Sequence, residues 1–211
     1  MSVFPLIIEN FITDEENEIL LNTITNHSKL FTSDKSPDPR WDERSAGIDR
    51  VHREGHESAW RILANIGLKI QNKIREIEKS QELFVEHPMY VRWLPGDHLD
   101  PPHADNIKQD GITPNKTPWR SHGAVLYINS DFTGGDFFYK NHDIEIIPKP
   151  KLLVLHRAGL EDMHGVREIL SGTRYTVTCF ATKDKTHEDK SLTSYLKSYN
   201  NFLENLKFSI D

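Results

Sequence analysis

The N-terminal part of the chain carries an apolar pattern that is typical of helices. Residues 3–12 predict a short strand and a turn, and Thr13 to Glu16 then has the form of a capping box. The apolar stripe that follows predicts a helix to about residue 28. Residues 57–79 place isoleucine and leucine at steps of three and four, which predicts an amphipathic helix. Residues 32–56 are charged and broken by proline and glycine, so we expect a long loop there.

From residue 83 the spacing of hydrophobic residues changes from the helical period to one typical of strands. Short runs rich in β-branched and aromatic residues alternate with clusters of Gly, Pro, Asn and Asp, which indicates a sandwich or barrel. The predicted strands are 83–85, 89–94, 123–128, 136–139, 144–147, 151–155 and 172–181. A gap at 106–120 predicts a second long loop, and an apolar stripe from Leu192 to Leu206 predicts a closing helix.

This layout predicts one domain over residues 1–211, mainly β with flanking helices. Helical support is expected at about 13–80, the β core at about 83–182 and a C-terminal helix at about 188–207. A chain of 211 residues fits a single domain and can bury a core without disulfides.

Charge and composition exclude several classes of function. The net charge of −6 argues against nucleic-acid binding, which needs a basic face. No apolar run is long enough to cross a membrane, and the N-terminus lacks the pattern of a signal peptide. We therefore expect a soluble, cytoplasmic protein. A single cysteine, Cys179, excludes an internal disulfide framework and thiolate metal sites.

Histidine is the remaining source of nitrogen ligands, and seven of the eleven histidines lie between residues 87 and 164. His103 and Asp105 occupy alternate positions, so on an extended chain both side chains point to the same side. With His164 they would form a site of two histidines and one carboxylate. Such a site suits Fe(II) enzymes that leave three positions open, and zinc hydrolases use the same residue types with one open position. The second His-x-Asp sequence, His187 to Asp189, has no suitable neighbours.

Arg174 begins a strand that looks central, in which one face is apolar and the other carries Arg174 and Thr176. A buried arginine is rare unless it is paired. The guanidinium fork and the hydroxyl could bind the carboxylate of a ligand. The alternative is an edge-strand arginine that pairs with a surface acid.

These residues and several others form an ordered set along the chain that resembles the Fe(II)/2-oxoglutarate-dependent dioxygenases, the prolyl 4-hydroxylase group in particular. The resemblance covers about residues 6–182. It rests on the opening sequence IIENFITDEENEILLNTI and on Pro95-Gly96, His103-Ala104-Asp105-Asn106, Leu126-Tyr127-Ile128-Asn129, Gly134-Gly135-Asp136-Phe137, Pro148, His164 and Gly172-Thr173-Arg174-Tyr175-Thr176.

The resemblance implies a double-stranded β-helix, or jelly-roll, core. It implies that His103, Asp105 and His164 ligate Fe(II), and that Arg174 pairs with the distal carboxylate of 2-oxoglutarate. Tyr127 would hydrogen-bond the same carboxylate, and Thr176 would be a third contact. O2 would be the second co-substrate, and ascorbate the reductant.

The activity implied is hydroxylation of an unactivated C–H bond, with a prolyl residue in a peptide or protein as the expected substrate and a small molecule as the other option. Two alternatives stay open: a non-catalytic jelly-roll that binds a ligand or acts as a scaffold, and a His/His/Asp zinc hydrolase. Trp41 and Trp119, in the two long loops, are candidate lid residues, and His98 and His122 are expected near the cavity mouth.

The chain departs from the family near the expected substrate position. The family often has a tyrosine on the strand before the His-x-Asp sequence, where this chain has Trp93 and Leu94. Tyr90 and Arg92 share a face of that strand and are candidate replacements.

Overall fold

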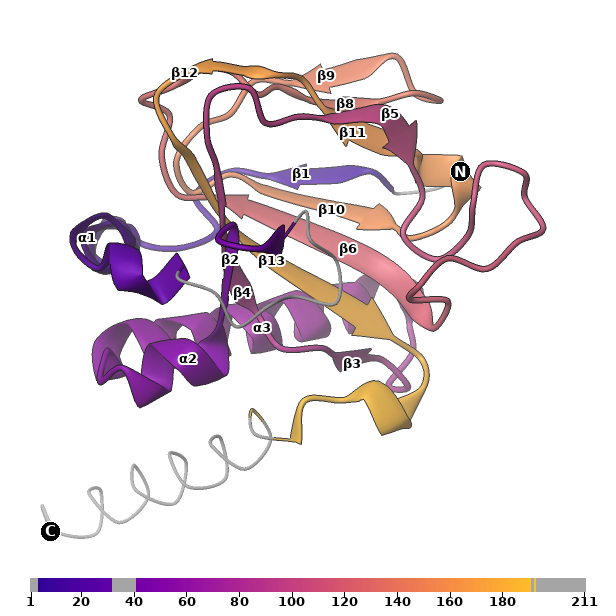
Figure 1. Ribbon diagram of the computed structural model, residues 1–211. Helices are drawn as coiled ribbons and strands as arrows, with labels where there is room; N and C mark the ends of the chain where they lie inside the picture. The colour runs from indigo at the N-terminus through magenta and orange to yellow at the C-terminus, as the bar shows by residue number, and fades with distance from the viewer. Residues whose placement is uncertain (1–3, 32–40, 191, 193–211) are drawn as a thin grey trace, which may run out of the picture.

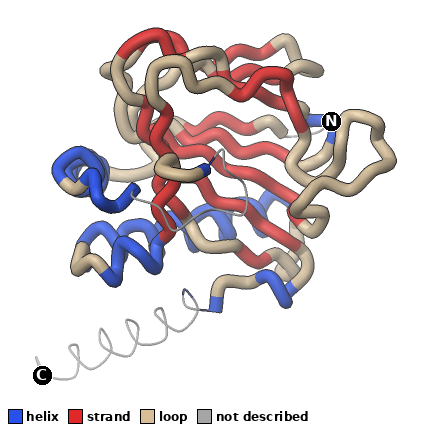
Figure 2. The backbone as a smooth tube through the Cα atoms, in the orientation of Figure 1, coloured by secondary structure: helices blue, strands red, loops and turns tan. Residues whose placement is uncertain are grey.

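The computed structural model describes residues 4–31, 41–190 and 192. Two antiparallel sheets face each other, and the helices cover the outer face of the larger sheet (Figure 1). The layered arrangement of strands over helices is also clear in the backbone trace (Figure 2). In this part of the chain no helix has the length and apolar character needed to cross a membrane. The expected fold, mainly β with a jelly-roll core and flanking helices, is confirmed.

The larger sheet has the strand order β1-β10-β6-β13-β4-β2, and β3 pairs with the end of β13. Its strands are β1 (Leu6–Ile8), β2 (Ser45–Gly47), β3 (Phe84–Val85), β4 (Met89–Trp93), β6 (Arg120–Tyr127), β10 (Leu153–Arg157) and β13 (Arg174–Thr182). The long strand β13 therefore lies in the middle of the sheet, as its sequence predicted.

The smaller sheet has the order β5-β11-β8-β9, and a two-stranded ribbon pairs β12 with β7. The bounds are β5 (Leu99–His103), β7 (Thr133–Gly134), β8 (Phe137–Tyr139), β9 (Ile144–Ile146), β11 (His164–Val166) and β12 (Ile169–Ser171).

The predicted N-terminal helices are present as α1 (Asp14–Asn26) and α3 (Glu57–Glu78), joined by the short helices η1 (Ser28–Phe31) and α2 (Ile48–Arg53). The capping box is made: the Thr13 hydroxyl accepts from the Glu16 N–H, and the Glu16 carboxylate accepts from the Thr13 N–H. Two further short helices are η3 (Leu160–Asp162) and η4 (Lys185–His187).

Strand alternation divides the core into two clusters. Leu126, Leu155 and Val177 of the larger sheet pack toward the helices. Their neighbours Tyr127 and Val154 point to the other face and pack against the smaller sheet. The candidate site lies on this second face, between the two sheets.

The prediction of a loop over residues 32–56 is wrong for residues 45–53, which form β2 and α2. Ala46 and Ile48 are almost fully buried, and β2 pairs with β4. The apolar signal is only a few residues long and is flanked by charged residues, so periodicity did not reveal it. Residues 32–40 of this segment lie outside the described residues.

The sequence also missed four short strands that lie outside the predicted ones: β5, β7, β11 and β12. Strand β5 contains Pro101 and Pro102, which argue against a strand, but it lies at the edge of the smaller sheet, where proline is tolerated. Most of the predicted C-terminal helix at about 188–207 lies outside the described residues.

Candidate active site

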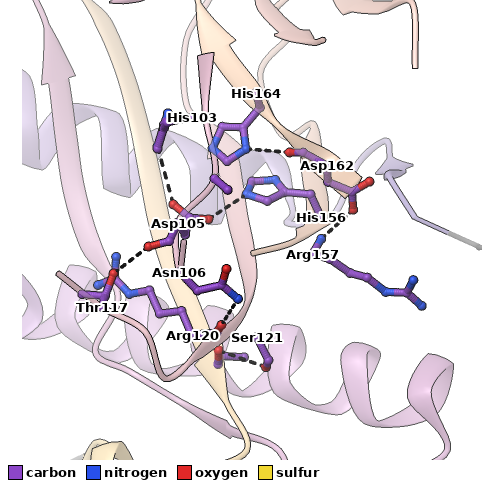
Figure 3. Close-up of polar contacts among 12 residues, drawn as sticks. His103, Asp105, Asn106, Thr117, Arg120, Ser121, His156, Arg157, Asp162 and His164 are labelled. Carbon is purple, nitrogen blue, oxygen red and sulfur yellow. Dashed lines mark hydrogen bonds and ion pairs between the residues drawn. The ribbon is translucent and has the colours of Figure 1, made fainter. Parts of the chain in front are cut away.

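Strand pairing brings His103, Asp105 and His164 together (Figure 3). His103 ends β5 and lies opposite His164, the first residue of β11, in the antiparallel register. Asp105 follows two residues after His103. Each of the three offers a ligand atom, and these atoms lie within 4.8 Å of one another. This is the one such group of histidine, cysteine and acidic residues in the described part of the chain.

Two hydrogen bonds of its own backbone hold Asp105 in place. Its N–H donates to the Ala158 carbonyl at 2.9 Å, and its own carbonyl accepts from the Thr117 hydroxyl at 3.0 Å. The predicted loop at 106–120 therefore supports the Asp105 turn. Burial alone would raise the pKa of the Asp105 carboxyl, but the nearby imidazoles of His103 and His156 hold that pKa well below its usual value. The carboxylate is thus ionised, as a metal ligand must be.

His164 is oriented by its backbone neighbourhood. Its Nδ1 donates to the Asp162 carbonyl at 3.0 Å, which leaves Nε2 for a metal. Burial, with repulsion from His156, lowers the pKa of His164 to about 3, so the ring stays neutral. Asp162 is itself fixed, because its carboxylate accepts from the Arg157 N–H and pairs with His142 at 2.6 Å.

The donor set fits an iron ion. His103 Nδ1 is buried without a hydrogen-bond partner in the described structure. Two histidines and one carboxylate, clustered between the sheets, leave positions for co-substrates, which is the arrangement of non-haem Fe(II) oxygenases. Cys179 is buried in the other cluster, beneath the helices, so no thiolate competes.

Arg174 is buried between the sheets with 2% of its surface exposed. Its Nη2 donates to the Tyr127 hydroxyl at 3.2 Å, and Nε has no partner in the described structure. No acidic side chain among the described residues forms an ion pair with it. A buried charge of this kind is costly unless it is paired, so the guanidinium is suited to an incoming carboxylate. The alternative of an edge-strand arginine paired with a surface acid is therefore wrong.

Thr176 shares this environment. It is almost fully buried, lies two residues after Arg174 on the same face of β13, and is opposite Tyr127 in the register. The structure thus brings Arg174, Tyr127 and Thr176 together, while their roles toward a ligand stay predictions.

Of the three residues considered for the family's upstream tyrosine, Trp93 alone faces the site. It pairs with Arg174 in the register, and its ring centroid is 5.9 Å from the guanidinium carbon. Tyr90 is buried in the helix-side cluster, and Arg92 stacks on Phe31.

A cavity of about 250 Å³ opens beside Trp93. Trp41 also lines it, edge-on to Trp93 with the ring centroids 5.9 Å apart. His98 lines the same cavity, next to the ion pair of Arg44 and Asp97 at 2.7 Å. Trp41 and His98 are therefore at a cavity beside the site, as the sequence led us to expect.

Trp119 and His122 are not at this cavity. Trp119 donates to Glu86 and stacks on His187 at a separate surface hollow. His122 lies on the helix-facing side of the larger sheet, where its Nε2 is 3.5 Å from Glu78. The expectation that they sit over or near the site is wrong, because alternation along β6 turns His122 away from it.

Sequence reasoning gave no role to His156, yet its Nε2 lies 3.4 Å from Asp105 Oδ2 (Figure 3). The signal was present: His156 follows Val154 by two residues and so shares its inward face. The run Leu153 to Leu155 is apolar at every position, which hid that alternation.

Comparisons with known proteins agree with this geometry. No family model matches the chain. Over 105 residues, or 44% of this chain, it is 30% identical to prolyl 3-hydroxylase 1 of Rattus norvegicus. That stretch is 14% of the relative's length, so the chain matches about a seventh of this curated protein.

Two solved structures share the fold over most of their length. One is a prolyl hydroxylase of Trichoplax adhaerens in complex with a hypoxia-inducible-factor peptide fragment, with a TM-score of 0.65 and 18% identity, covering 86% of this chain and 84% of that one. The other is the viral collagen prolyl hydroxylase of Paramecium bursaria chlorella virus-1 in complex with 2OG, with a TM-score of 0.59 and 18% identity, covering 86% and 97%.

The site and the comparisons lead to one assignment of fold. This chain has the jelly-roll fold of the 2OG–Fe(II) oxygenases, and its structural neighbours are prolyl hydroxylases.

Proposed function

We propose that this protein is an Fe(II)- and 2-oxoglutarate-dependent dioxygenase that hydroxylates a prolyl residue in a peptide or protein. The observation that carries the proposal is that one chain combines the cluster of His103, Asp105 and His164 with a buried guanidinium, that of Arg174, which has no acidic partner among the described residues. A zinc hydrolase would have a use for the first three residues and none for the fourth.

Each residue of the chain has a defined task in this proposal. His103, Asp105 and His164 would hold the iron, and Arg174 with Tyr127 would bind the distal carboxylate of 2-oxoglutarate. When bound, the iron and 2-oxoglutarate supply the oxidation, in which O2 is consumed, succinate and CO2 form, and one oxygen atom enters the C–H bond. Ascorbate is the reductant that keeps the iron in its ferrous state.

The aromatic cavity supports a prolyl substrate. Trp93 lies beside Arg174, and Trp41 lies edge-on to Trp93 on the cavity side. Proline-rich segments dock on aromatic surfaces in their extended conformation. We expect Trp41→Ala to weaken use of a proline-rich peptide while 2-oxoglutarate binding is unchanged. Mass spectrometry would report the gain of one oxygen atom on the peptide.

Turnover of 2-oxoglutarate tests the proposal. Purified protein with Fe(II), ascorbate and 2-oxoglutarate should form succinate slowly without a peptide. His103→Ala should abolish this, whereas the matched control His27→Ala, a histidine of the α1–η1 junction, should keep it. Full activity in His103→Ala would overturn the assignment. Activity supported by zinc and indifferent to 2-oxoglutarate would favour the hydrolase, and no 2-oxoglutarate binding by the metal-loaded protein would favour a scaffold.

We also propose that the protein works in the cytoplasm as one domain over residues 1–211. Its single cysteine, Cys179, is buried and unpaired, so the described structure uses no disulfide and is compatible with a reducing compartment.

A further inference from the structure

His156 is a buried histidine that the proposed reaction does not use. It lies on β10 with 1% of its surface exposed and faces the space between the sheets. Its Nε2 is 3.4 Å from Oδ2 of Asp105, and neither atom has another hydrogen-bond partner in the described structure. The other oxygen of Asp105, Oδ1, faces His103 Nε2 at 3.6 Å. The two carboxylate oxygens therefore face different histidines.

Tyr139 sets the tautomer of His156. The Tyr139 hydroxyl lies 3.2 Å from His156 Nδ1. A tyrosine is protonated at neutral pH, and the Asp105 carboxylate draws the ring proton of His156 to Nε2, so the phenol is the donor to Nδ1. The ring proton of a neutral imidazole then resides on Nε2, where it points at the Asp105 carboxylate. The opposite tautomer would place a lone pair against a negative oxygen.

The imidazole of His156 fits between the sheets because the residue opposite it on β6 is a glycine. Gly123 of β6 is the register partner of His156, and a Cβ at Gly123 would lie 2.3 Å from His156 Nε2. No side chain fits there unless the imidazole moves. The absence of a side chain at Gly123 thus lets the imidazole lie over the backbone and reach Asp105.

We propose that His156 is a positioning residue for Asp105. Its Nε2–H, fixed by Tyr139, donates to Oδ2 and leaves Oδ1 as the single carboxylate oxygen that faces the metal position. This inference rests on the proposed function, because it concerns the same metal centre. His156 lies outside the group whose ligand atoms are within 4.8 Å of one another, so the geometry favours a donor to Asp105 over a fourth ligand.

Metal binding by three variants tests the inference. Co(II) is titrated into the metal-free protein, and the dissociation constant and visible spectrum are recorded. His156→Phe keeps a ring and loses the donor, so affinity should fall about 10- to 100-fold, the range typical for such outer contacts. His156→Gln supplies an amide N–H and should restore most of it. Tyr139→Phe removes one hydroxyl and should give a smaller loss.

The controls separate a positioning role from a structural one. His122→Phe replaces a buried histidine on the opposite face of the same sheet and should bind Co(II) like the wild type. Unfolding of each metal-free variant checks folding, and if His156→Phe does not fold, Tyr139→Phe and His156→Gln decide. The visible spectrum of the Co(II)-loaded wild type should indicate coordination by one carboxylate oxygen and two histidines. In Tyr139→Phe both this spectrum and the Co(II) affinity should differ from those of the wild type.

The outcomes distinguish the two proposals. Failure of the wild type to bind Co(II) or Fe(II) would overturn the proposed function. If the wild type binds tightly and His156→Phe has the same affinity and spectrum, the inference alone is overturned. If His156→Phe does not fold, the same result in Tyr139→Phe overturns it. Equal losses in the Gln and Phe variants of His156 would also overturn it, because the amide donor would then have rescued nothing.

Discussion

At the scale of the residue, the site depends on a buried positive charge that the described protein does not neutralise. Arg174 has one hydrogen bond, to the Tyr127 hydroxyl, and lies beneath the ring of Trp93. A buried arginine destabilises the folded protein unless an anion pairs with its guanidinium. The guanidinium is therefore suited to binding an anionic ligand, and its burial lowers the stability of the ligand-free protein.

We expect Arg174→Ala to raise the KM for 2-oxoglutarate by one to two orders of magnitude, because a hydrogen bond to a charged group contributes on the order of 2 kcal/mol. Iron affinity should be unchanged, since Arg174 is not in the ligand group. Succinate formation at varied 2-oxoglutarate measures the first quantity, and metal titration the second. An unchanged KM would show that the carboxylate binds elsewhere.

At the scale of the element, three short strands determine the site. Strands β5, β11 and β8 lie side by side, and Gly165 in the centre of β11 allows this close packing. A Cβ at Gly165 would lie 2.6 Å from the Leu99 carbonyl oxygen and 2.6 Å from the Phe138 ring. Both neighbours belong to strands of the smaller sheet, so a methyl group there must push β5 away from β11.

Gly165→Ala should therefore destabilise the protein by about 1–3 kcal/mol, the range for overpacking, and weaken metal binding by separating His103 from His164. Gly47→Ala is the matched control, because a Cβ there meets nothing closer than 3.6 Å and its φ of −67° suits any residue. Urea unfolding and metal titration measure both effects. Equal behaviour of the two variants would contradict this account of the strand packing.

The strands also show how far the sequence could predict the structure. Helices α1 and α3 and the central strand β13 have strong periodic patterns and were predicted well. His103, Asp105, His164 and Arg174 were found because their residue types and order are distinctive. Strands β5 and β11 were missed because they are short and owe their pairing to distant partners. His156 was missed because the apolar run Leu153 to Leu155 hid the alternation that turns its side chain toward Asp105.

At the scale of the whole molecule, the larger sheet separates two environments. One face holds the charged groups of the site, and the other packs on the helices. His122 is a buried titratable group on the helix side, close to Glu78 at the end of α3. Burial lowers the pKa of His122 to about 4, against the opposing attraction of Glu78.

Protonation of His122 should therefore make stability depend on pH. Between about pH 4 and 6.5 the unfolded chain binds a proton at this site that the folded protein does not, so the free energy of unfolding should fall as pH falls through this window. The contribution is on the order of 3 kcal/mol. In His122→Phe this part of the dependence should vanish, as urea unfolding at several pH values would reveal. The same slope in both proteins would contradict the assignment.

The central claim is that this chain is a dioxygenase, and the fate of the oxygen atoms tests it most directly. The protein is incubated with Fe(II), ascorbate and 2-oxoglutarate under heavy-isotope oxygen gas, and the succinate is analysed by mass spectrometry. The account predicts one heavy oxygen atom in each succinate molecule, because one atom of O2 completes its new carboxylate. Succinate without the heavy isotope, or no succinate from protein that binds Fe(II), would contradict it.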